Sequence, residues 1–488
     1  MTSTTFPAST DSRLHVTEGR GWSASTWVLL VVLGGALFLD GLDISMVGVA
    51  LPSIGADLGM SPSALQWIVS GYVLGYGGLL LLGGRAADLL GRRSVFLVAV
   101  AAFGIASVVS AFLSNDLAII ALRFLKGIAA AFTVPAGLSI ITTTFAEGPA
   151  RNRALSIYTI CGASGFSMGL VFGGVLTELG WRATFLLPGP VAILLFIAGL
   201  KVIPHAARER VSLKHFDLVG AFTVTASLLV LVYAVVEAPE RGWTAPSTIV
   251  LLVASVALAA TFIAVERRHD HPLVRLGILR SAHVVHANVV GAVMFGGYVA
   301  FQFVVTLYLQ NSLGWSPIAM ALGFLPAGIL VVASAVKMDV ILERYDTRWI
   351  IAIGLAAFVA GYALFLRVEP GMSYVSLLLP TMLLLGVGFA LCFPSINSQA
   401  TAGVADHEQG LASGLVNTSV QIGGAVMLAV VSAIIGTGPA QSGELLPHMT
   451  TAIAAVVGLT SVGLIGTLAV LGARRAPAAE VVEPCVAC

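Results

Sequence analysis

The segment Leu58-Gly59-Met60-Ser61-Pro62 recurs 255 positions later as Leu313-Gly314-Trp315-Ser316-Pro317. A second pair of segments keeps the same offset, because Asp88-Leu89-Leu90-Gly91-Arg92-Arg93 corresponds to Glu343-Arg344-Tyr345-Asp346-Thr347-Arg348. In each half of the chain, the second segment comes directly after the apolar run that follows the first segment. Two landmarks at one offset are hard to obtain by chance. The chain is therefore expected to contain two parallel structural repeats.

The composition places these repeats in a lipid bilayer. Of the 488 residues, 58% are hydrophobic and only 10% are charged, and the mean hydropathy is +0.97. Soluble domains carry about 25% charged residues, and a membrane-spanning helix needs roughly 20 apolar residues. Fourteen apolar runs lie near residues 27–51, 65–83, 95–114, 117–141, 155–177, 183–203, 216–236, 247–265, 284–309, 317–338, 349–367, 374–396, 409–435 and 450–472. We predict an all-α integral membrane protein with fourteen transmembrane helices.

The common offset also divides the chain. Helices 1–6 and 9–14 correspond to one another, as in two bundles related by an axis along the membrane normal, and helices 7 and 8 are inserted between them. The predicted parts are a tail at 1–26, a six-helix bundle at 27–203, the inserted pair at 215–268, a second bundle at 284–472 and a tail at 473–488. We expect the inserted pair to lie at the periphery.

The distribution of basic residues indicates the orientation. With both termini in the cytoplasm, 19 of the 25 Lys and Arg residues fall in inner segments and three in outer segments. The other three, Arg123, Lys126 and Lys337, fall within predicted spans. This bias obeys the positive-inside rule and predicts a multi-pass protein of the cell membrane with cytoplasmic termini. The first apolar run is too long for a cleavable signal, and the formal net charge of +1 gives no reason to expect a nucleic-acid partner.

Four charged residues lie inside predicted helices 1 and 4. Asp40 and Asp43 are three residues apart, as are Arg123 and Lys126, so each pair shares one helix face. A charge at the centre of a span costs roughly 2.5–3.5 kcal/mol on insertion scales, so these residues indicate a functional site. At a rise of about 1.5 Å per residue, the depths predict Asp43 with Arg123 and Asp40 with Lys126, facing a central cavity.

Two interpretations of this cluster stay open. The simpler one is a structural ion pair that locks two helices together. The functional one makes Asp40 a proton carrier, because neighbouring bases favour its charged form and burial disfavours it. Two acids against two bases favour the functional interpretation.

Three motifs resemble those of the fourteen-helix drug:proton antiporters of the major facilitator superfamily. They are Leu42-Asp43-Ile44-Ser45-Met46-Val47-Gly48-Val49-Ala50-Leu51-Pro52, Gly84-Arg85-Ala86-Ala87-Asp88-Leu89-Leu90-Gly91-Arg92-Arg93 and Arg123-Phe124-Leu125-Lys126-Gly127. The chain departs from the family pattern at Ser45 (usually Thr), Gly48 (usually Asn), Leu89 (commonly Arg) and Lys126 (usually Gln). The resemblance covers nearly the whole chain and implies proton-coupled export by alternating access.

The loop after helix 2 is expected to gate the transporter. Gly84 and Gly91 permit tight backbone at a helix end, and Asp88 can meet a helix N-terminus or a base in the other half. Arg92 and Arg93 supply the basic end of the loop. The second copy keeps Glu343 and Arg344, but it has Asp339 and Asp346 where glycines are expected. It therefore predicts a weaker latch or none, and a plain basic inner loop is the alternative for both copies.

Helix 5 carries small residues at close intervals, at Gly165, Gly169, Gly173 and Gly174. This spacing lets helices approach closely. The stretch resembles the antiporter motif of the family, although Leu170 stands where the family has Pro, which makes export less secure than transport. Gly165-Phe166-Ser167-Met168-Gly169 also fits a hydrolase elbow, but that chemistry needs a strand–turn–helix and this serine lies mid-span. We expect no enzyme activity.

Polar residues of the second half are candidates for a substrate cavity. They are His286, Tyr298, Gln302, Asn417 and Gln421. Bonds between helices explain each of them as well as substrate contact does, and His286, near a helix start, fits an interfacial place better than a proton relay. Cys485 and Cys488 form half a zinc site at best, and no lysine follows a glycine as a phosphate-binding loop requires. We expect no metal and no cofactor.

The sequence therefore predicts a monomeric secondary transporter that exports small amphipathic or cationic compounds as protons enter. A proton-coupled importer of an organic acid or nutrient is the first alternative, since Arg123 and Lys126 would suit an anion. A membrane sensor or scaffold without transport is the second, and the paired buried charges argue against it. The inserted helices are expected to contribute little to transport.

Overall fold

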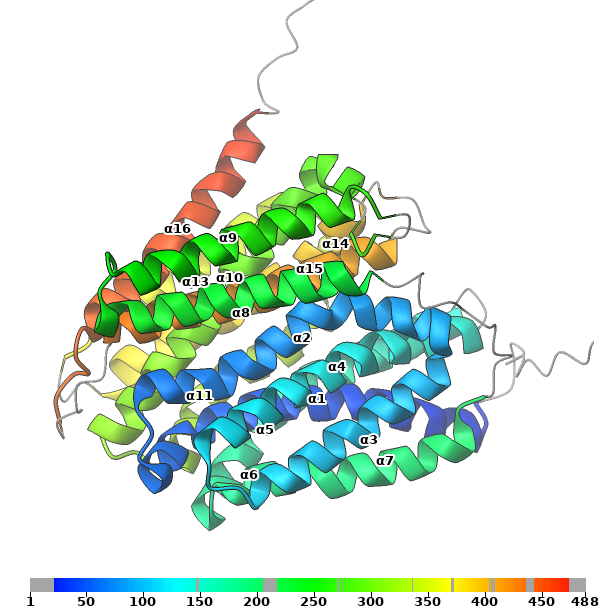
Figure 1. The fold of residues 1–488 in the computed structure, drawn as a ribbon, viewed down its shortest axis with the longest axis horizontal. Helices are drawn as coiled ribbons and strands as arrows, with labels where there is room; N and C mark the ends of the chain where they lie inside the picture. The colour runs from blue at the N-terminus through cyan, green and yellow to red at the C-terminus, as the bar shows by residue number, and fades with distance from the viewer. Residues whose placement is uncertain are drawn as a thin grey trace, which may run out of the picture.

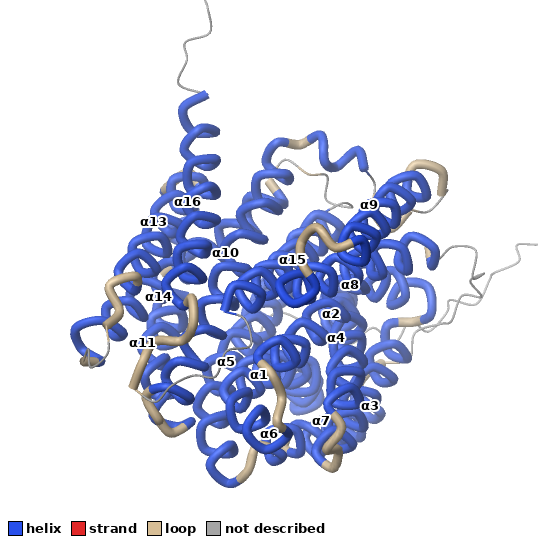
Figure 2. Tube along the Cα trace, turned by 60° about the vertical axis from the view of Figure 1, so that its left-hand side comes forward, coloured by secondary structure: helices blue, strands red, loops and turns tan. Residues whose placement is uncertain are grey.

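The computed structural model describes residues 22–145, 149–204, 217–269, 272–274, 276–335, 337–369, 373–402, 404, 409–435 and 443–473. The two cysteines of the C-terminal tail, the arginines at 13, 20, 474 and 475, and the residues 1–21 lie outside these ranges. Figure 2 shows a bundle of helices with connecting loops. Within the described residues, fourteen helical segments are long and apolar enough to cross a bilayer, which confirms the predicted fold class.

The first bundle comprises α1 (Ala24–Leu58), α2 (Pro62–Leu90), α3 (Arg92–Ala111), α4 (Asp116–Thr144), α5 (Pro149–Leu179), α6 (Arg182–Leu186) and α7 (Pro188–Val202). The short α6 and α7 together form one span, with the break at Leu187 just before Pro188. A proline is tolerated at the first position of a helix because its missing N–H is unpaired there anyway.

The second bundle comprises α10 (Ala282–Leu307), a π-helical turn (Tyr308–Ser312), α11 (Pro317–Ala335), α12 (Met338–Arg344), α13 (Thr347–Phe365), a π-helical turn (Tyr374–Leu378), α14 (Leu379–Thr401), α15 (Gln409–Ile435) and α16 (Met449–Ala473). A 3-10 turn (Leu276–Arg280) precedes α10. The expected span at 317–338 ends at α11, so Lys337 is exposed between α11 and α12 instead of lying within a span, which corrects that prediction.

The first repeated landmark forms the same structure in both halves. Gly59 and Gly314 both adopt the left-handed conformation, each with φ of 66°. The hydroxyl of Ser61 accepts the N–H of Ala64 at 3.3 Å, and that of Ser316 accepts the N–H of Ala319 at 3.2 Å. Serine is a preferred helix N-cap, and glycine pays no Cβ penalty at positive φ. Under the orientation predicted from the basic residues, the end of the molecule that holds these two turns faces outward, and we call it the outer end.

The second landmark differs between the halves. Gly91, with φ of 96°, makes the turn from α2 into α3. At the corresponding place, Asp346 caps α13, and its carboxylate accepts the N–H of Arg348 at 2.9 Å. The aspartate therefore replaces a glycine turn with a helix cap, because a short acidic side chain can satisfy an unpaired N–H of the first turn.

The inserted helices are α8 (Leu218–Arg241) and α9 (Pro246–Glu266). Figure 1 shows α8 running beside α2 and α15, with α9 on its far side, and the element contacts agree. Ser227 and Ser255 join the two helices, because each hydroxyl donates to the backbone oxygen of the other residue at 2.9 and 3.0 Å. Among the described elements, α9 packs extensively on α8 alone, whereas α8 touches both halves of the molecule.

Candidate functional site

Asp43 is the centre of a buried charge cluster. Its carboxylate accepts one bond from Arg123 and another from Lys126, one on each oxygen. The three side chains are between 0% and 1% exposed, so the ions are removed from solvent. A buried ion persists only when it is paired and hydrogen-bonded, and here one acid meets two bases.

Arg123 and Lys126 each make further contacts that stabilise their charge. The Arg123 Nε donates to the backbone oxygen of Ile68 at 2.9 Å, and the guanidinium lies 4.5 Å from the ring centre of Tyr72. The Lys126 ammonium lies 4.7 Å from the ring centre of Phe103 and 5.7 Å from that of Phe185. Aromatic faces attract cations, so these rings partly replace the lost water.

Asp40 has a different environment. It does not pair with Lys126, which corrects that prediction, and its carboxylate instead accepts the hydroxyl of Tyr72. Three residues along a helix correspond to a rotation of about 60° between the two acids, which turns Asp43 toward α4 and leaves Asp40 facing α2. The prediction used depth alone, whereas the rotation about the helix axis decides the partner.

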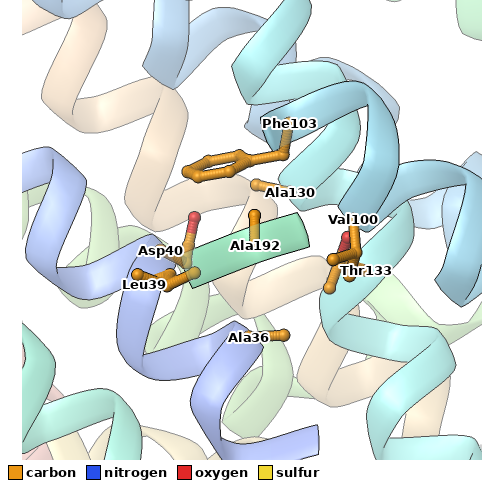
Figure 3. Close-up of a pocket in the computed structure, with 8 residues that line it drawn as sticks. All are labelled: Ala36, Leu39, Asp40, Val100, Phe103, Ala130, Thr133 and Ala192. Atoms are coloured by element: carbon orange, nitrogen blue, oxygen red, sulfur yellow. The ribbon is translucent and has the colours of Figure 1, made fainter. Parts of the chain in front are cut away.

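The side chain of Asp40 borders a small cavity inside the first bundle. Its lining residues are Ala36, Leu39, Asp40, Val100, Phe103, Ala130, Thr133 and Ala192, from α1, α3, α4 and α7, and Figure 3 shows them around the carboxyl group. The volume of about 10 Å³ is close to the smallest that admits a water molecule. The charges therefore lie within one bundle, not along an open central cavity as the sequence suggested.

The glycines of α5 line its contacts with α1 and α11. An added Cβ at Gly165 would meet the backbone of Phe38, and one at Gly169 would meet Ser45 and Leu42. An added Cβ at Gly173 would lie 2.9 Å from the Met46 Cα. Gly174 instead faces the other half, where an added Cβ would lie 2.7 Å from the Ile318 Cα. Close packing of α1 on α5 is completed by the Ser45 hydroxyl, which donates to the Phe166 oxygen at 2.7 Å.

The loop residues lie at the end of the molecule opposite the two serine-capped turns. Asp88 lies in the last turns of α2, and Arg92 begins α3. The Arg93 guanidinium donates to the Leu200 oxygen of α7 at 2.6 Å, which ties the loop to its own bundle. Gly84 approaches α4, since an added Cβ would lie 3.7 Å from Pro135. In the second copy, Glu343 and Arg344 are exposed on α12.

The candidate cavity residues separate into two groups. Gln302 and Gln421 lie at the interface of the halves. The Gln302 Nε2 atom is 3.8 Å from the position that a Cβ added at Gly48 of α1 would take, and Gln421 packs against Gly77 of α2. Asn417 lies on the same helix, α15, and donates to the Ser413 oxygen at 3.1 Å. His286 lies inside the second bundle instead, with ring nitrogens 3.2 Å from Gln399 and 3.0 Å from Thr467.

Tyr298 leads to an aromatic cluster that sequence reasoning missed. Its ring centre lies 6.1 Å from that of Phe166 on α5 and 5.5 Å from that of Phe389 on α14. Phe389 stacks on Phe393 at 5.5 Å with an interplanar angle of 15°. The cluster joins residues of both halves. Apolar spans are full of phenylalanine, so no sequence signal distinguishes these rings from lipid-facing ones.

Comparisons with known proteins agree with this architecture. The model of the Major Facilitator Superfamily matches residues 33–428. The chain belongs to this superfamily of transporters. A puromycin resistance protein of Streptomyces alboniger is 38% identical over 439 residues, which cover 88% of this chain and 86% of that protein. A cephamycin export protein of Amycolatopsis lactamdurans is 34% identical over 435 residues, which cover 88% and 90%.

Solved structures support the same fold. The crystal structure of the POT family transporter PepTSo aligns with a TM-score of 0.68 at 16% sequence identity and covers 93% of this chain and 98% of that one. At this identity the likeness concerns the fold alone. This major facilitator protein is therefore a multi-pass membrane transporter of small molecules and not an enzyme.

Proposed function

We propose that this transporter exports small amphipathic or cationic compounds, including antibiotics, in exchange for protons. The observation that carries the proposal is the contrast between two neighbouring acids. Asp43 is bonded to two bases, whereas Asp40 is bonded to a tyrosine hydroxyl beside a small cavity. The antibiotic-resistance and export roles of the relatives, as their names state them, support the direction of transport.

The charge balance explains why Asp40 is the proton carrier. With both acids ionised, two negative and two positive groups make the cluster neutral. Protonation of Asp40 leaves Asp43 between its two bases and changes the net charge of the buried cluster by one. A site with two accessible protonation states, coupled to two conformations of the halves, can exchange a proton for a substrate.

The structure weakens the case for an importer of anions. Arg123 and Lys126 were the residues that would suit an organic acid. Both bind Asp43, and Arg123 also donates to the Ile68 oxygen. An anionic substrate would have to break these bonds. The aromatic cluster around Tyr298 instead offers ring faces, which suit apolar and cationic compounds.

Transport measurements in liposomes test this proposal. Purified protein is placed in liposomes with an imposed pH gradient and offered a panel of cationic dyes, antibiotics and organic acids. We expect uphill movement of cationic or amphipathic compounds toward the acidic side and no gradient-driven movement of organic acids. Accumulation of an organic acid together with protons would favour the importer.

We also propose that both termini are cytoplasmic and that the protein works as a monomer. The 19-to-3 distribution of basic residues supports the orientation. Cys485 and Cys488 are natural reporters, because Cys392 is buried and Cys161 is only partly exposed within α5. A membrane-impermeant thiol reagent should label the tail in inverted vesicles but not in intact cells. Labelling of the tail in intact cells would reverse the orientation.

A further inference from the structure

Two buried acids meet where the inserted helices begin and end. Asp217 caps α8, and its Oδ1 accepts the N–H of Gly220 at 2.7 Å. Glu266 is the last residue of α9, and its Oε2 accepts the N–H of Val274 at 3.1 Å. The two residues are 1% and 4% exposed. Neither belongs to the cluster around Asp43.

The second oxygen of each carboxyl group lacks a partner. Asp217 Oδ2 and Glu266 Oε1 are both buried and accept no hydrogen bond in the structure. Asp217 begins α8 and Glu266 ends α9, which packs on α8, so the hairpin brings the two carboxyl groups to the same end, close enough to interact. Two ionised carboxylates facing each other away from water repel strongly, so the pair needs a positive ligand or a proton between them.

A proton fits this site better than a metal ion. Calcium and magnesium bind six or more oxygens, and no group of three His, Cys, Asp or Glu residues occurs among the described residues. One oxygen of each carboxyl group already accepts a backbone N–H, from Gly220 or Val274, which leaves only two carboxyl oxygens for a ligand. A hydrogen bond between a carboxylic acid and a carboxylate needs only one proton and satisfies both remaining oxygens.

The bases that the structure describes near the pair do not bond to its two unpartnered oxygens. Arg267, Arg268 and Arg280 are exposed, and His269 is partly exposed. Within the described parts of α8, α9 and the segment after them, the groups that act on the Glu266 carboxyl are Asp217 and the N–H groups of Leu273 and Val274. Among the described residues, the charge balance of the site therefore depends on the two acids themselves.

We propose that Asp217 and Glu266 share one proton and form a second proton-binding site, which holds the segment 272–274 against the inner end of the α8–α9 hairpin. Leu273 packs on the apolar cluster that includes Ala221 of α8, and Ile278 packs on Val284 and Ala412 of the second bundle. The segment 272–274 and the 3-10 turn that follows it in the chain thus link the hairpin to the second bundle. Loss of the proton places two negative charges together and releases this link, while Ser227 and Ser255 keep the hairpin itself intact.

Hydrogen–deuterium exchange of the full-length protein in nanodiscs tests the proposal. After correction for intrinsic exchange rates, the protection of residues 272–274 in the wild type should fall about tenfold per pH unit between the pH at which the separated acids titrate and the higher pH at which the closed pair loses its proton, because opening releases one proton in that range. Above that range the protection should level off. In Glu266→Gln the amide donates to Asp217 without a titrating proton, so protection should not depend on pH. Asp217→Asn should behave in the same way, since asparagine also caps helices well.

Infrared difference spectroscopy identifies the proton directly. The wild type should show the carbonyl band of one protonated carboxyl group that disappears in both Glu266→Gln and Asp217→Asn. The band should survive in Asp40→Asn, which separates this site from the proposed transport site. Equal pH dependence of exchange in the wild type and both variants, or a change of protection on adding magnesium or calcium at constant pH, would overturn the proposal.

Discussion

The hydroxyl of Tyr72 donates a hydrogen bond to the carboxylate of Asp40, and the face of the same tyrosine ring lies against the guanidinium of Arg123. One residue of α2 therefore touches both parts of the charge cluster, the acid proposed to carry the proton and the base that binds Asp43. Tyr72 is fully buried, so no water competes for these contacts. A change in the protonation of Asp40 therefore acts directly on the hydrogen bond from Tyr72.

Replacing Tyr72 by phenylalanine should change the pH dependence of transport. The substitution keeps the ring against Arg123 and removes the hydroxyl that donates to Asp40. A hydrogen bond to a charged group contributes about 1.5–3 kcal/mol, so its loss favours the neutral acid and moves the pH of half-maximal transport up by about one to two units. Transport rates across a pH series check this, with Tyr76→Phe as the control. An unchanged profile would show that Tyr72 does not tune Asp40.

Removal of single charges from the cluster should destabilise the protein in a definite order. Asp43→Asn leaves two buried bases without their acid and should cost about 3–5 kcal/mol, as for other broken buried ion pairs. Lys126→Met should cost less, because the Asp43–Arg123 bond remains. Combining Asp43→Asn with Lys126→Met should recover part of the loss, since one unpaired base is removed.

Thermal unfolding of the purified variants in detergent measures this order. Arg123→Met should lie between the other two single variants, because Arg123 also donates to the Ile68 oxygen. If Lys126→Met proves more damaging than Asp43→Asn, the bonding pattern around Asp43 is wrong.

Alanine at Gly169 should disrupt the contact between α1 and α5. The new methyl group would meet Ser45 and the backbone of Leu42, and overpacking of this kind costs about 1–3 kcal/mol. Gly466 of α16 is a matched control, because it is exposed and an added Cβ meets nothing within 4 Å. We expect Gly466→Ala to keep or raise the unfolding temperature and Gly169→Ala to lower it. Equal behaviour of the two variants would contradict the packing argument.

A bond between the halves should hold the outer end closed. Gln310, in the π-helical turn after α10, donates to the Val49 oxygen of α1 at 2.9 Å. Gln310→Leu removes this donor at nearly constant size and should increase the population of outward-open molecules. A cysteine at Gly48, where an added Cβ has only ordinary contacts, reports the opening through its labelling rate from outside. Slower labelling of Gly48→Cys when Gln310→Leu is added would contradict the claim that the Gln310–Val49 bond holds the outer end closed.

The sequence predicted the features of the fold that a lipid bilayer requires. A bilayer requires long apolar helices, so the fourteen spans could be counted from composition and length, and the turns at Gly59 and Gly314 were found by their repetition. The predicted ends differ most where a helix continues beyond its apolar run, as at Leu58 of α1 and Leu90 of α2, which were expected to end near 51 and 83.

The partners within the site could not be predicted in the same way. Rise per residue gives depth, and the prediction paired the four charged residues by depth alone. Rotation about each helix axis depends on which face packs on which neighbour, and spans that are apolar all round carry no such signal. The sequence therefore paired Asp40 with Lys126, whereas Asp43 takes both bases and Asp40 meets Tyr72.

Substrate-driven proton movement in liposomes tests the role of Asp40 most directly. Liposomes without a pH gradient are loaded with a cationic substrate and a pH-sensitive dye, and outward flow of the substrate is started by dilution. The wild type should acidify the lumen as protons enter in exchange. Asp40→Asn should still exchange labelled for unlabelled substrate but should move no protons. Acidification by Asp40→Asn at the wild-type rate would contradict the assignment of Asp40 as the proton carrier.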